Sequence, residues 1–399
     1  MNKRCGTSSL SAHDIYRWEK ERRTPDQYLE DIAAVLELEV ERLLVLTRGT
    51  LPGGGAPPQP AHLTEPEDDV DRREFSGAVA GAFAAVSLSA APAQARSRGR
   101  QIGMSDVNRN RHRIADLRRL DDYTGGAHTH SLAEAHVAEL ERMLKFDSYS
   151  QPVHTELLST LAEAGQFAAW TAFDSGLLDV ARKMAQKATR AANQAGNRLL
   201  AASTLSELSY LTASSSNPKE ATAIARAAWT NAPRDALPAA RVVFADRWAY
   251  ACARVGDARG VDRALGLSAD AHNERDSRHD PEPDWVYWIN RDESLIMEGR
   301  CWAELRMHTR AIPVLEKVTA PYDDTHAREV ALFECWRAGS YLDAGEVEQA
   351  TGAMSRAVDL TGSTQSPRTD RWVGGVLQRL KQHQDVAPVR DLLERTATV

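Results

Sequence analysis

The side chains of this chain that could bind a metal ion gather in one short stretch. It holds His128, His130 and His136, preceded by Asp121 and Asp122. Imidazole and carboxylate groups are common zinc ligands. A His-x-His pair and a third histidine six residues later do not share one face of a helix, because helix neighbours lie three or four residues apart. We therefore expect polar loop histidines here and no metal site.

The rest of the chain carries no recognisable catalytic pattern. It contains no H-E-x-x-H motif, no G-x-S-x-G turn, no Walker loop and no dinucleotide fingerprint. The glycine run at 53–55 lies in a proline-rich stretch, which is typical of a linker and not of a phosphate loop. The sequence thus predicts a protein that is not an enzyme and needs no cofactor.

Three tryptophans are the candidates for a ligand or partner groove. Trp285 and Trp288 are three residues apart, so on a helix their side chains would be neighbours, and Trp302 follows them. Large aromatic side chains can form a platform for a ligand or peptide, or they can form the core where helices pack. Packing is the favoured interpretation, and the groove stays open as the alternative.

Composition favours helices and gives no overall attraction for nucleic acid. The chain has 399 residues and a net charge of −7, so any DNA contact must come from a local basic face. Alanine and arginine are abundant whereas Phe, Ile and Lys are sparse, which favours an all-α fold. The four cysteines have no metal-ligand spacing, so we expect buried free thiols in a reducing cytoplasm.

A helical unit recurs about every forty residues from residue 130 onward. Each copy has a polar or glycine turn, then a small residue within an amphipathic helix, and the longest gap between copies coincides with a polar loop from His272 to Asp284. Helix pairs with this period predict a tetratricopeptide-like α-solenoid, whose stacked pairs leave a concave groove. The small anchoring residues are Ala181, Ala221, Gly260, Ala311 and Ala350.

The region before the repeats has the composition of a linker, with an apolar segment at 77–91. Arg72-Arg73 precedes this segment and Ala93-Gln94-Ala95 follows it, an order that resembles a twin-arginine export signal. The segment is shorter than the roughly 20 residues that a spanning helix needs. We favour a helix packed within the protein or an apolar linker, with export or membrane association as the alternative.

A basic stretch from Arg96 to Arg119 follows the apolar segment. It allows two interpretations. The arginines could contact DNA phosphates beside a DNA-binding head. They could instead be the solvated face of a helix that begins with Ser105 as its N-cap and ends at about Leu120, which is the favoured interpretation.

The first fifty residues carry the strongest functional pattern. Ile15-Tyr16-Arg17-Trp18-Glu19 predicts a short helix with an inward tryptophan, and a basic turn ending in Pro25 and a second amphipathic helix follow. This segment resembles the C-terminal part of an Xre-type, lambda-repressor-like helix-turn-helix domain. The resemblance implies a recognition helix in the major groove, with Arg17 pairing to guanine. The residues implied to face DNA are Ser11, Ala12, His13, Tyr16 and Arg17.

The resemblance extends beyond the head. The family places two helices before the position of Ser9, where this sequence has eight residues, so we expect either an upstream start or a truncated head. The stretches Val107–Gly126, Gly165–Gly176 and Pro283–Trp285 resemble a group of actinomycete regulators. These couple an Xre-type head to a tetratricopeptide-like C-terminal domain.

Together these patterns predict an all-α cytoplasmic transcription regulator in three parts. A partial helix-turn-helix head spans 1–48, a linker spans 49–104, and a helical-repeat sensor domain spans 105–399. The expected partners are DNA, a second copy of the chain, and a peptide, small-molecule or protein effector in the groove. A protein–protein interaction scaffold with a vestigial head is the alternative.

Overall fold

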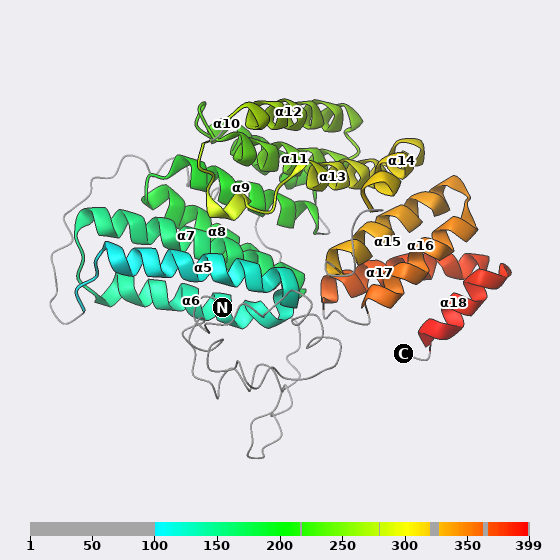
Figure 1. Cartoon of the computed structure of the whole chain (residues 1–399), viewed down its shortest axis with the longest axis horizontal. Helices are drawn as coiled ribbons and strands as arrows, with labels where there is room; N and C mark the ends of the chain where they lie inside the picture. Colours follow the sequence, from blue (N-terminus) through cyan, green and yellow to red (C-terminus); the bar gives the residue numbers. More distant parts are fainter. Residues whose placement is uncertain (1–99, 216–217, 279, 320–326, 362–365, 398–399) are drawn as a thin grey trace, which may run out of the picture. The chain divides into compact units, whose positions relative to one another are not determined.

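The described part of the protein is built of α-helices. The computed structural model describes residues 100–399 except 216–217, 279, 320–326, 362–365 and 398–399. These residues form fourteen α-helices, α5 to α18, and three short 3₁₀ turns, with no β-strand in the described ranges (Figure 1). The predicted head and apolar segment lie outside the described residues.

Six helix pairs follow two leading helices, α5 (Met104–Thr124) and α6 (Gly126–Phe146). The first helix of each pair contacts the first helix of the next pair, so these helices form one continuous row, called here the inner helices. They are α7 (Gln151–Asp174), α9 (Arg198–Ala213), α11 (Pro238–Arg254), α13 (Arg291–Glu304), α15 (Ala327–Ala344) and α17 (Pro367–Leu380).

In the first five pairs the second helix packs against its own first helix, whereas the second helix of the last pair packs against that of the preceding pair. These second helices are called the outer helices. Most of them bury one face, whereas inner helix α9 is buried at every position from Leu200 to Ala213. Helix α9 has this burial because it contacts inner helices α7 and α11 as well as two outer helices. The outer helices are α8 (Leu178–Gln194), α10 (Ala221–Asn231), α12 (Ala258–Ser277), α14 (His308–Thr319), α16 (Val347–Thr361) and α18 (Ala387–Ala397).

The predicted repeat is confirmed in its register. Each anchoring small residue lies in the first turn or so of an outer helix, and the four anchoring alanines are fully buried. Gly260 shows why the position must be small, because a Cβ there would lie 2.7 Å from Sγ of Cys252 on the paired inner helix. Gly256, with φ 78°, turns the chain between these two helices, in a region that favours glycine.

Three local predictions were wrong. Helix α5 begins at Met104 with Gly103 as its N-cap, and not at Ser105, because the Asp106 carboxylate accepts the Gly103 N–H at 3.0 Å. The predicted loop from His272 is helical to Ser277, since α12 is long and buries His272. Trp285 and Trp288 lie in a connection containing a 3₁₀ turn, Asp284–Val286, and not on an α-helix.

Two further findings concern the surroundings of this fold. Cys252, Cys301 and Cys335 are buried and unpaired, as expected for free thiols. Among the residues that the structure describes, every helix is too short or too polar to cross a lipid bilayer.

Candidate functional site

The six inner helices each contribute one side chain to a buried polar group, called here the central cluster. Asp174 comes from the end of α7, Tyr210 from α9, Tyr250 from α11 and Arg300 from α13, and all six members are buried. Buried charged groups are rare unless paired, so their convergence marks this place in the array. The central cluster is Asp174, Tyr210, Tyr250, Arg300, Arg328 and Arg368.

Arg300 lies at the middle of the central cluster and is only 2% exposed. Its Nη1 donates to Oη of Tyr210 and its Nη2 to Oη of Tyr250, each at 2.6 Å. The guanidinium carbon lies 3.8 Å from the ring centre of Tyr250 and 4.6 Å from that of Trp336. Aromatic faces attract cations, so these rings partly replace the water that the guanidinium loses.

Tyr210 connects two arginines. Its oxygen accepts from Arg300 and, at 3.2 Å, from Nη2 of Arg368. Burial opposes ionisation of this phenol, but the nearby guanidinium groups outweigh burial and lower the pKa of Tyr210. Burial raises the pKa of Tyr250 to about 12, against the influence of Arg300. The two rings, 5.2 Å apart, therefore differ in their tendency to hold a proton.

Asp174 joins segments that are far apart in the sequence. One carboxylate oxygen accepts from the Gly126 N–H at 3.1 Å and from Nη1 of Arg328 at 3.0 Å. The other accepts from Oγ of Ser366 at 3.2 Å and lies 3.6 Å from Arg368. Burial would raise the pKa of Asp174, but these arginines and hydrogen bonds outweigh it and lower the pKa. Asp174 thus holds α6, α15 and α17 to the end of α7.

The connection between α12 and α13 makes a second long-range contact, with α5. Asp284 pairs with Arg118 at 2.8 Å and with Arg119 at 2.5 Å. The Tyr287 hydroxyl donates to Asp122 at 2.7 Å, and Arg119 lies 4.0 Å from the Tyr287 ring centre. This connection therefore closes back onto the first described helix.

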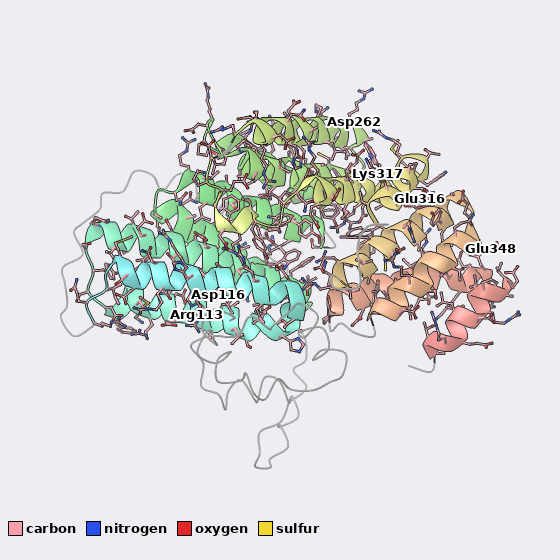
Figure 2. The ribbon with its side chains drawn as sticks, viewed as in Figure 1. Arg113, Asp116, Asp262, Glu316, Lys317 and Glu348 are labelled. Carbon is pink, nitrogen blue, oxygen red and sulfur yellow. The ribbon has the colours of Figure 1, made fainter. Side chains whose placement is uncertain are left out.

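In the described part of the basic stretch, the arginines form ion pairs with carboxylates of the protein itself. Each arginine of α5 has a carboxylate partner; Arg113, labelled in Figure 2, pairs with Glu139 at 2.9 Å. Arg118 is buried, so the favoured interpretation of a solvated face is wrong at this position because Glu163 and Asp284 draw the side chain inward. Arg96 and Arg98 lie outside the described residues.

The three candidate tryptophans occupy two different places. Nε1 of Trp288 donates to the Trp285 carbonyl at 3.1 Å, so these two lie together, with Trp285 buried and Trp288 38% exposed. Trp302 is buried on α13, where Arg310 of α14 lies 3.4 Å from its ring centre. Trp336 and Trp372, which the sequence did not single out, are the tryptophans beside Arg300.

The histidine stretch forms part of α6 and not a loop, because the helix begins directly after Gly125, whose φ is 78°. Within the described ranges no group of three His, Cys, Asp or Glu side chains is placed to hold a metal ion. His136 is fully buried, and burial lowers its pKa to about 4. The residues implied to face DNA, Ser11 to Arg17, lie outside the described residues.

A buried hydrogen-bond chain links α11, α12 and α13. Oγ of Ser294 donates to Asp246 at 2.6 Å and lies 2.8 Å from Nε2 of His272. The hydroxyl hydrogen of Ser294 points to the Asp246 carboxylate, so the His272 imidazole is not placed to accept this proton. These three residues therefore lack the arrangement that activates a serine nucleophile. Burial raises the pKa of Asp246 to about 6.

The central cluster had one signal in the sequence. Trp170, Tyr210 and Arg300 each lie eleven residues before an anchoring small residue, and Tyr250 lies ten before Gly260. Equivalent positions of stacked repeats face the same side of the array. Bulky polar residues at this one repeat position therefore indicated a shared site, whereas Arg328 and Arg368 have no such spacing.

The fold and the site together define an all-α protein of stacked helix pairs with a charged centre. A scan against models of protein families finds no match to this chain, and a search of curated proteins finds no relative.

Proposed function

We propose that this protein is a DNA-binding transcription regulator whose helical-repeat domain senses an effector. The head segment would read DNA, and the repeat domain would bind a peptide, small molecule or protein partner. The protein would act in the cytoplasm as a homodimer, because two heads on one symmetric dimer can read two half-sites. Binding of the effector would change the spacing of the heads and hence DNA affinity.

The single observation that supports sensing is the convergence of six inner helices on the central cluster. A ligand that contacts any member of this cluster contacts a network that extends from α7 to α17. Asp174 and Arg368, which join those two helices, are 194 residues apart. Differential binding energy at such a network can shift how the helices pack. The sequence pattern from Ile15 to Pro25 supports the DNA half of the proposal.

A salt titration of DNA binding tests the regulator. Fluorescence anisotropy of labelled genomic fragments is measured with the full chain and with Arg17→Ala. We expect the logarithm of affinity to fall linearly with the logarithm of salt concentration. Loss of a base-reading arginine costs about 1–3 kcal/mol, so Arg17→Ala should bind the preferred fragment roughly 5- to 150-fold more weakly.

The matched control is Arg306→Ala, which removes an exposed arginine from the repeat domain. This variant should bind DNA as tightly as the unmodified chain. Equal affinity of Arg17→Ala and the unmodified chain, or no salt-sensitive association at all, would refute the DNA half. A scaffold with a vestigial head would then be the better description.

A further inference from the structure

The central cluster contains more positive charge than its own carboxylates balance. Arg247, which lies beside the cluster over the Tyr210 ring, is neutralised by Glu207 at 2.7 Å. Within the cluster, Arg368 lies 3.6 Å from Asp174. Arg300 has no carboxylate oxygen within 4.0 Å among the residues that the structure describes. Asp174 also pairs with Arg328 at 3.0 Å, although Arg328 has a closer carboxylate partner in Glu329 at 2.6 Å. One buried guanidinium thus lacks a counter-ion.

Glu304 does not supply that counter-ion. It lies on the same helix as Arg300 and raises the pKa of Arg300, but its carboxylate pairs with Arg254 at 2.8 Å. The hydroxyl oxygens of Tyr210 and Tyr250 therefore accept the hydrogen bonds of Arg300, and the surrounding aromatic rings complete its environment. Isolated buried charge is costly, and hydroxyl oxygens offset only part of the cost.

The same place holds hydrogen-bond donors without acceptors. Nε of Arg300 is buried and has no partner in the described part of the chain. The Tyr210 oxygen already accepts from two guanidinium groups, and no contact within the described ranges gives its own hydrogen an acceptor. A guanidinium edge beside a phenol hydrogen is a donor set that suits an oxyanion.

We propose that the central cluster binds an oxyanion, a carboxylate or phosphate group of the effector, through Arg300, Arg368 and Tyr210. The anion supplies the missing negative charge and accepts from the Arg300 Nε–H. It also competes with Asp174 for Arg368, because the ion pair between these two residues is long, at 3.6 Å. This inference rests on the proposed function only in treating the anion as part of an effector.

Access to Arg300 requires movement, because its side chain is almost completely buried. The N-terminal end of α17 is the element that must separate, since Ser366 and Arg368 hold it to Asp174 of α7. An anion that draws Arg368 away weakens this attachment. Binding at the central cluster therefore loosens α17 from α7.

Two small probes, inorganic phosphate and succinate, test the proposal on the full chain without DNA. The thermal midpoint and the tryptophan fluorescence are followed during titration, with chloride at equal ionic strength as the blank. A ligand that binds only the folded state raises the midpoint with concentration. We expect a saturable rise with at least one probe and a fluorescence change, because Trp336 and Trp372 lie beside Arg300. The probe that binds more tightly identifies the anion as phosphate or carboxylate.

Arg300→Met is the decisive variant. Replacing an uncompensated buried charge by an apolar side chain of similar length is compatible with folding. This variant should bind the probe at least tenfold more weakly, and Arg368→Met should weaken binding as well. Arg310→Met is the matched control, because Arg310 also lies over a tryptophan ring but belongs to outer helix α14.

Two results would overturn the proposal. One is an equal midpoint shift in Arg300→Met and Arg310→Met, or no saturable shift with either probe. The other is a tyrosinate absorbance band at neutral pH that Tyr210→Phe abolishes, since Tyr210 itself would then be the counter-ion. Because neither probe experiment involves DNA, failure of DNA binding and failure of anion binding are separate results.

Discussion

Replacing Asp246 by asparagine should stabilise the protein at neutral pH. This carboxylate is buried between α11, α12 and α13, and burial raises its pKa from 3.8 to about 6. The native state therefore binds the Asp246 proton more tightly than the unfolded chain does. Since the folded pKa is raised, the contribution to stability is greatest below about pH 4, falls as pH rises, and is lost above about pH 6.

The magnitude follows from the size of the pKa shift. Each unit corresponds to 1.36 kcal/mol, so a shift of about two units makes the ionised carboxylate cost roughly 3 kcal/mol at pH 8. Asparagine has the shape of the protonated acid and can still accept from Ser294. We expect Asp246→Asn to raise the free energy of unfolding by up to about 3 kcal/mol at pH 8, and by little at pH 4.

Urea unfolding followed by circular dichroism between pH 4 and pH 8 measures this difference. The control is Asp270→Asn on α12, because Asp270 is exposed. The free energy of unfolding of this control should stay close to that of the unmodified protein at every pH. A loss of stability in Asp246→Asn at pH 8, or a gain that does not change with pH, would refute the assignment of the penalty to burial.

Two further changes test the long-range contacts and the repeat packing. Asp174→Asn removes the carboxylate that Arg328 and Arg368 share and leaves Arg328 paired with Glu329 and Asp121, so urea unfolding at pH 7 should show a loss of about 3 kcal/mol; a loss below about 1 kcal/mol would contradict the role of Asp174 as a junction. Gly260→Ala places a methyl 2.7 Å from Sγ of Cys252 and still closer to the capping carboxylate of Asp257, and it should cost about 1–3 kcal/mol. Gly266→Ala, on the same helix with open space around it, should instead gain up to about 1 kcal/mol, and equal effects of the two substitutions would contradict the packing argument.

The sequence was sufficient for the repeat but not for the site. Small residues such as Ala181 and Ala350 mark where two helices of one pair approach, and this is a local property with a fixed period. The contact between Asp174 and Arg368 depends instead on how the helix pairs between α7 and α17 stack on one another. No local sequence pattern specifies this stacking, so the contact between these two side chains could not be predicted from the sequence.

The local errors also have a physical origin. Ser105 is a favourable N-cap, yet Asp106 caps the Gly103 N–H one turn earlier in the chain, so α5 begins sooner. The arginines of α5 suggested a solvated or phosphate-binding face because, except for Arg109 and its neighbour Asp106, their carboxylate partners lie at least 26 residues away in the sequence. Glu163 and Asp284, which pair with Arg118, are 45 and 166 residues distant from it.

The junction at Asp174 limits how this array can evolve. Repeat arrays commonly gain or lose whole units, because each unit touches only its neighbours. Here α17 must return to α7, so duplication or deletion of one pair between them would carry Arg368 away from its carboxylate. Length variation is therefore tolerable after α17 but not between these two helices, and the number of intervening pairs is fixed by closure of the chain upon itself.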